Sequence, residues 1–153
     1  MNTKMNIAGA APFIAVPTFV YLIITAIISL NEKPFYTITE EHYGILIVLG
    51  IVLILLGILM VVNCARKLHK SFNQGLLMKD GLYKVFRNPM YAAYLLFIIP
   101  GIGLLFNSWL MLTTVLLNYI LLTIFIQREY RYLHEKFGSE YQSYLEKVSI
   151  KFL

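Results

Sequence analysis

Charged residues and cysteine are both scarce in this chain, and each shortage excludes a class of protein. Of 153 residues only 14% are charged and 59% are apolar, with eight acidic residues against thirteen basic ones and a net charge of +5. So apolar a composition excludes an ordinary soluble domain and predicts an integral membrane protein. Cys64 is the single cysteine, which excludes a disulfide framework and a thiolate metal cluster, and we interpret it as a small packing residue.

Ionisable side chains are also missing from the middle of the long apolar stretches. Four such stretches, at about residues 8–30, 44–64, 89–106 and 109–126, have nearly the length that a helix needs to cross a bilayer. The sequence therefore predicts an all-α, multi-pass protein that forms one membrane domain over residues 1–153. Ion-coupled transporters usually place a charged or histidine side chain at membrane depth, so its absence argues against that class.

Basic residues gather at particular ends of these spans. Twelve of the thirteen lie at the N-terminus, in residues 65–88 or after residue 126, whereas Lys33 lies in the first link. This asymmetry predicts that both termini and residues 65–88 face the cytoplasm. We interpret the positive charge as membrane anchoring rather than nucleic-acid binding, and residues 65–88 as an amphipathic segment on the membrane surface.

A strong start signal precedes the third span. Asn88 is a preferred N-cap residue, and Pro89 at the first helical position loses no hydrogen bond. The free N–H groups of this helix end, beside Arg87, predict a site for an anionic group at the membrane surface. Taken alone, Arg87 and the nearby tyrosines equally fit anchors in the lipid headgroup region.

Turn and glycine positions predict how the spans pack. Asn107 and Ser108 leave room only for a tight reversal, so spans three and four form a helical hairpin, with span three broken at residues 100–103. Glycines at positions 44, 50 and 57 predict a smooth face on span two. The fourth helix continues past residue 126 into a cytoplasmic extension, residues 127–153, and projects into the cytosol as far as Gly138, a plausible C-cap. The hairpin brings Glu129, on this extension, close to Asn88.

Two sequence blocks carry a resemblance to a known family. GLYKVFRNPMY at residues 81–91 is followed by the two-span hairpin and then by REYRYLHEKFGSEYQSYLEKV at residues 128–148. This order resembles the integral membrane methyltransferases of the isoprenylcysteine carboxyl methyltransferase and phospholipid methyltransferase group, over residues 75–153. The resemblance implies S-adenosylmethionine bound at the cytoplasmic edge, methyl transfer to a lipid or prenylated acceptor, and no metal.

The resemblance and the chemistry of the methyl donor together indicate site residues. Arg87 and the helix start at Asn88 suit the donor's carboxylate, and Glu129 suits its ammonium or ribose hydroxyls. We take Glu129 and Arg87 as the candidate catalytic residues, because an amine acceptor needs a base whereas a carboxylate acceptor is already ionised. The expected cofactor-binding residues are Leu77, Met78, Gly81, Tyr83, Arg87, Asn88, Pro89, Tyr91, Tyr94 and Glu129.

Departures from the family pattern leave the acceptor open. Asn88 stands where isoprenylcysteine enzymes have histidine, although phospholipid N-methyltransferases also use Asn-Pro-Met-Tyr, and Tyr130 replaces the second of two glutamates. Arg128 is the candidate substrate-binding residue. The C-terminal tail favours an isoprenylcysteine-type carboxyl O-methyltransferase, Asn88 favours phospholipid N-methylation, and a non-catalytic membrane scaffold is the third alternative. The sequence predicts no oligomeric state.

Overall fold

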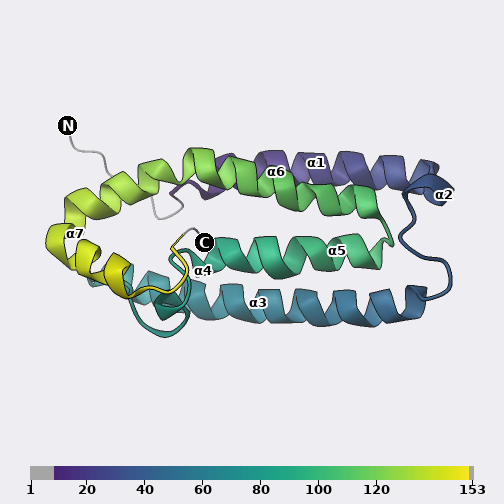
Figure 1. The fold of residues 1–153 in the computed structure, drawn as a ribbon. Helices are drawn as coiled ribbons and strands as arrows, with labels where there is room; N and C mark the ends of the chain where they lie inside the picture. The colour runs from purple at the N-terminus through teal and green to yellow at the C-terminus, as the bar shows by residue number, and fades with distance from the viewer. Residues whose placement is uncertain (1–8, 152–153) are drawn as a thin grey trace.

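The structure is a computed structural model that describes residues 9–151, apart from the side chains of residues 70, 72 and 73. This part of the chain is helical, with two isolated β-bridges and no strand (Figure 1). Its elements are α1 (Ala11–Asn31), α2 (Lys33–Tyr36), α3 (Tyr43–Asn73), the 3-10 helix η1 (Gly81–Lys84), α4 (Pro89–Ala93), the π-helix η2 (Tyr94–Ile98), α5 (Ile99–Leu105), α6 (Trp109–Phe125) and α7 (Gln127–Lys147). The all-α prediction is confirmed, and the predicted first residue of span one, residue 8, lies outside the described residues.

The long helices form two layers. α1 packs along α6, α3 packs along α5, and α5 contacts α6 across the hairpin (Figure 1). By length and composition, α1 and residues 43–69 of α3 can each cross a membrane, and α6 with α7 is a third candidate with a bend of 40°. Residues 89–105 form a shorter apolar helix. These helices indicate an integral membrane protein, while a count of exactly four spans stays a prediction.

Paired polar side chains join α1 to α6. Asn118 donates to Thr18 Oγ1 at 2.9 Å, and Ser29 lies 2.6 Å from Ser108 between their hydroxyl oxygens. Ser108 also caps α6, because its hydroxyl accepts from the Met111 N–H at 3.2 Å. Hydrogen bonds of this kind hold helices together where no water can satisfy the polar groups.

Close backbone contact joins α3 to α5. A Cβ added to Gly101 would lie 2.7 Å from Ile54 Cγ1 and 2.8 Å from the Gly50 carbonyl oxygen. A Cβ added to Gly57 would lie 2.6 Å from Ile98 Cγ1, whereas Gly44 has nothing within 4 Å. The predicted smooth face is therefore confirmed at Gly50 and Gly57 but not at Gly44.

Replacing Gly101 with alanine is expected to lower the free energy of unfolding by about 1–3 kcal/mol, because the added methyl group overpacks a backbone contact that cannot move aside. Gly44→Ala is the matched control, because an added methyl group there meets no other atom. Alanine has a higher helix propensity than glycine, so we expect the free energy of unfolding of this variant to be unchanged or slightly higher. Thermal unfolding of the detergent-purified variants measures both. Equal melting temperatures for the two variants would contradict this packing.

Two sequence predictions need correction. Span three is not broken at residues 100–103, because the π-helix η2, which ends two residues before Pro100, accommodates the missing N–H and the chain stays helical to Leu105. Residues 65–73 do not lie flat as a surface segment, since they continue α3 to Asn73 before Gly75 turns the chain with a φ of 67°. The predicted helix end at Gly138 is confirmed, because Gly138 (φ 48°, ψ −119°) interrupts α7 and bends it back toward the lower layer (Figure 1).

Candidate functional site

A cavity of about 940 Å³ lies between the two layers at the end where α7 folds back. It is lined by α1, the end of α3, the loop before η1, η1 itself, the continuous helix α4–η2–α5, Asn118 of α6, and α7. Its size falls within the range of small-molecule sites. Most of the predicted site residues line it, namely Leu77, Met78, Tyr83, Arg87, Asn88, Pro89, Tyr91, Tyr94 and Glu129.

Two predicted residues lie outside this lining. Gly81 has a φ of 67° and the Lys67 amine stands 2.8 Å from where its Cβ would be, so it shapes the turn into η1. Arg128 is exposed, with its guanidinium carbon 5.8 Å from the centroid of the Phe13 ring. The structure therefore brings Arg87 and Glu129 to one cavity and leaves Arg128 outside it.

Aromatic residues of α7 hold the Arg87 side chain. Its Nη2 and Nε donate to the Tyr141 hydroxyl at 2.6 and 3.1 Å, and its Cζ lies 3.2 Å from the centroid of the Tyr130 ring. Within residues 9–151 no carboxylate lies within ion-pair distance of Arg87. A fixed guanidinium without a carboxylate partner is suited to binding an anionic group.

Glu129 enters the cavity from the first turn of α7. The Tyr91 hydroxyl donates to its Oε2 at 3.4 Å, and the Ala10 backbone N–H donates to the same carboxylate. Burial raises the pKa of Glu129 above its ordinary value, against the opposite effects of these hydrogen bonds and of the nearby Arg87 charge. The residue is thus a desolvated acid that is suited to bind a cation or accept a proton.

The raised pKa predicts that Glu129 destabilises the fold when it is ionised. Because the folded state holds this proton more tightly than the unfolded chain does, the free energy of unfolding falls as the pH rises through the raised pKa. Glu129→Gln removes this loss, and we expect a melting temperature above wild type at neutral pH, by about 2–4 °C for each kcal/mol recovered. Thermal unfolding of both proteins at acidic and neutral pH measures this difference. A melting temperature of Glu129→Gln below that of wild type at neutral pH would contradict the predicted direction.

Asn88 corrects one detail of the predicted helix start. α4 does begin at Pro89, and the Asn88 carbonyl accepts from the Ala92 N–H at 3.0 Å. The Asn88 side chain makes no capping hydrogen bond, however, and donates instead to the Tyr130 hydroxyl. Asn88 and Tyr130, the two departures from the family pattern, are therefore partners of each other.

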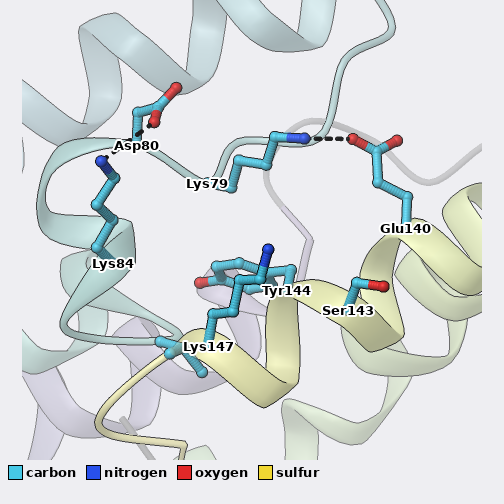
Figure 2. A pocket seen from close by; sticks show the side chains of 8 residues that line it. Lys79, Asp80, Lys84, Glu140, Ser143, Tyr144 and Lys147 are labelled. Carbon is cyan, nitrogen blue, oxygen red and sulfur yellow. Dashed lines mark hydrogen bonds and ion pairs between the residues drawn. The ribbon is translucent and has the colours of Figure 1, made fainter.

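The segment after Gly138 lines the cavity with Tyr141 and Tyr144 and packs against the loop around η1, a contact that sequence reasoning missed. We call residues 139–150 the C-terminal clamp. Its Tyr144 hydroxyl donates to the Tyr83 carbonyl at 2.9 Å. Glu140 pairs with Lys79 at 2.8 Å, as Figure 2 shows. The Ile150 N–H donates to the Val85 carbonyl at 2.7 Å. The clamp therefore holds the loop around η1 in place, and residues of this loop line part of the cavity.

The sequence does contain a signal for the helix of the clamp, namely a row of aromatic and apolar residues at helical spacing. Tyr141, Tyr144 and Val148 recur at helical spacing after Gly138, and all three are buried. Burial raises the pKa of Tyr144 to about 12, so its hydroxyl stays protonated as the donor. Among residues 9–151 no group of three His, Cys, Asp or Glu side chains gathers to hold a metal.

Comparison with known proteins places the chain in a family. A family model described as phospholipid methyltransferase matches residues 45–140, more than half of the chain. The matched range includes Arg87, Asn88 and Glu129 and ends before Tyr141. Neither a curated protein nor a solved structure matches the chain.

Proposed function

We propose that this chain, which belongs to the phospholipid methyltransferase family, transfers a methyl group from S-adenosylmethionine to a lipophilic acceptor at the cytoplasmic edge of the membrane. The family consists of integral membrane methyltransferases. The observation that carries the proposal is that Arg87, without a carboxylate partner, and the desolvated Glu129 line one cavity whose inner part is apolar. The cavity therefore offers a charged surface for the cofactor next to an apolar surface for the acceptor.

The side chains present fit S-adenosylmethionine. Arg87 would bind its carboxylate, and Glu129 would bind its ammonium group or ribose hydroxyls. The ring of Tyr91 lines the same cavity and offers an aromatic face to a sulfonium cation. When bound, the cofactor supplies an electrophilic methyl group.

The residues of the chain contribute positioning and one proton acceptor. Methyl transfer by direct displacement requires the nucleophile and the methyl carbon to be aligned at contact distance, and the clamped loop and α4 would fix that alignment. Burial keeps water from competing with the acceptor and strengthens the charge interactions of Arg87 and Glu129. If the acceptor is an amine, Glu129 would accept its proton.

Two acceptor classes remain, and an amine on a phospholipid-type headgroup has the better support. Its support is the raised pKa of Glu129, which brings a carboxylate closer to the range of an effective general base, and the Asn88 form of the motif. The alternative is an isoprenylcysteine-type carboxylate, which the C-terminal tail with Tyr141 and Tyr144 supports.

Isotope-labelled S-adenosylmethionine distinguishes these acceptors. The purified protein is incubated with the labelled cofactor and either ethanolamine phospholipid or a prenylcysteine analogue, and the products are treated with base. Label that stays non-volatile on the headgroup amine indicates N-methylation, whereas label released as volatile methanol indicates a methyl ester. Label in neither product would overturn the methyltransferase proposal. The same assay is run on Glu129→Gln, with Glu135→Gln as its control, because Glu135 is an exposed acid of α7.

A further inference from the structure

Two residues of α7 surround the guanidinium of Arg87. The Tyr141 hydroxyl accepts hydrogen bonds from Arg87 Nη2 at 2.6 Å and from Nε at 3.1 Å, so it occupies the edge of the guanidinium that these two nitrogens form. The ring of Tyr130 covers one flat face, with its centroid 3.2 Å from Cζ. The guanidinium is thus held along one edge and over one face.

The backbone of Arg87 is fixed by the same part of the chain. Its N–H donates to the Ile150 carbonyl at 3.0 Å, and Ile150 and Tyr141 both belong to the C-terminal clamp. Tyr141 is 2% exposed, and its ring stacks on that of Tyr144 with 6.1 Å between the centroids. Because closely packed side chains have little room to move, Tyr141 is a rigid support for the guanidinium.

The other edge of the guanidinium keeps donors for a ligand. Of its five N–H groups, Tyr141 accepts one from Nε and one from Nη2, and no described residue accepts from Nη1. In the described part of the chain, the fully buried polar side-chain atoms without a partner are Thr114 Oγ1 and Asn118 Oδ1, so Nη1 retains accessible surface. Since Arg87 lines the cavity, its Nη1–Nη2 edge remains for two parallel hydrogen bonds to a carboxylate.

We propose that Tyr141 is a positioning residue for cofactor binding, because its hydroxyl fixes one edge of Arg87 and so keeps the Nη1–Nη2 edge aligned for the cofactor's carboxylate. In this role Tyr141 acts through Arg87 rather than on the cofactor itself. A ligand that immobilises a mobile arginine side chain loses affinity to the lost conformational entropy, and a partner that already holds the side chain reduces that loss. The inference rests on the proposed function in taking the cofactor's carboxylate as the ligand of Arg87.

Tyr141→Phe tests this role with a second ligand that lacks the carboxylate. Equilibrium binding of S-adenosylmethionine and of its decarboxylated form is measured with the full-length protein in detergent. The phenylalanine keeps the ring and its stacking on Tyr144, so we expect the variant to fold, which thermal unfolding checks. We expect Tyr141→Phe to weaken cofactor binding about tenfold and to leave binding of the decarboxylated form unchanged, because Arg87 binds only the carboxylate.

Tyr144→Phe is the matched control. It removes a buried hydroxyl from the same helix, together with the hydrogen bond to the Tyr83 carbonyl, but it leaves Arg87 untouched. Any loosening of the clamp should therefore change the affinities for the two ligands by the same factor. In an Arg87→Ala background, Tyr141→Phe should have no further effect on cofactor binding, because its effect depends on the guanidinium.

The outcomes of these measurements separate the inference from the proposed function. The inference is overturned if Tyr141→Phe binds the cofactor like wild type, if it weakens both ligands by the same factor, or if it acts further in the Arg87→Ala background. It is also overturned if Tyr144→Phe shows the same carboxylate-specific loss. A folded wild-type protein that binds neither ligand would overturn the proposed function, and the inference with it.

Discussion

Replacing Arg87 with alanine is expected to weaken S-adenosylmethionine binding by about 100-fold. The guanidinium is the one charged group that we assign to the cofactor's carboxylate, and removal of a charge-assisted hydrogen bond within a desolvated site costs about 1.5–3 kcal/mol or more. In this variant the Tyr141 hydroxyl also loses its hydrogen-bond donor, and the Tyr130 ring loses the guanidinium that lies over it. Equilibrium binding of the labelled cofactor to the purified protein measures the effect.

Arg128→Ala is the matched control for this loss. Arg128 is an exposed arginine on α7 that does not line the cavity, so its removal subtracts the same charge without touching the site. Cofactor binding by this variant should equal that of wild type. Equal losses of cofactor binding in the two variants would show that binding needs positive charge in general at this end of the protein. That result would contradict the assignment of Arg87 to the cofactor's carboxylate. Thermal unfolding of Arg87→Ala confirms that the protein measured is folded.

Glu129→Gln is expected to lower the rate of methyl transfer by about 100-fold, the lower end of the range for loss of a general base. The amide can still accept hydrogen bonds from Tyr91 and Ala10, so the local packing is retained. Rates of transfer from the labelled cofactor to the preferred acceptor, measured across pH, give the comparison. Wild type should gain activity as the pH rises through the raised pKa of Glu129, and the variant should lose that part of the profile.

The same substitution acts in opposite directions on activity and on stability. The melting temperature rises at neutral pH because an ionised carboxylate is removed from a desolvated position, whereas the activity falls because the proton acceptor is lost. A variant that loses both would behave as an ordinary structural mutant. Glu135→Gln, at an exposed position of the same helix, should change neither quantity.

Helix boundaries were predictable wherever a local signal sets them. The start of α4 at Pro89 and the start of α6 at Trp109 follow from the residues that precede them, and the structure confirms both. Close packing at Gly50 and Gly57 was predictable for the same reason, since a missing side chain is visible in the sequence. Local chemistry of this kind depends little on the rest of the chain.

Features that depend on distant partners were not predictable. Asn88 is of a residue type that commonly caps helices, yet its side chain forms a hydrogen bond with Tyr130, which lies 42 positions further on. Residues 65–73 have an amphipathic pattern that fits a surface segment or the end of a longer helix, and packing decides between the two. The bend at Gly138 was predictable from the glycine itself, but the contact of Tyr141 with Arg87 and the attachment of the C-terminal clamp depend on residues far away in the sequence.

Calorimetric titration of the purified wild-type protein with S-adenosylmethionine tests the central claim most directly. If Arg87 and Glu129 enclose a cofactor site, the titration should saturate at one molecule per chain, with a dissociation constant in the range of about 1 μM–1 mM that is usual for enzyme ligands. No saturable heat up to about 10 mM cofactor, tenfold beyond that usual range, in a protein shown to be folded, would contradict the claim.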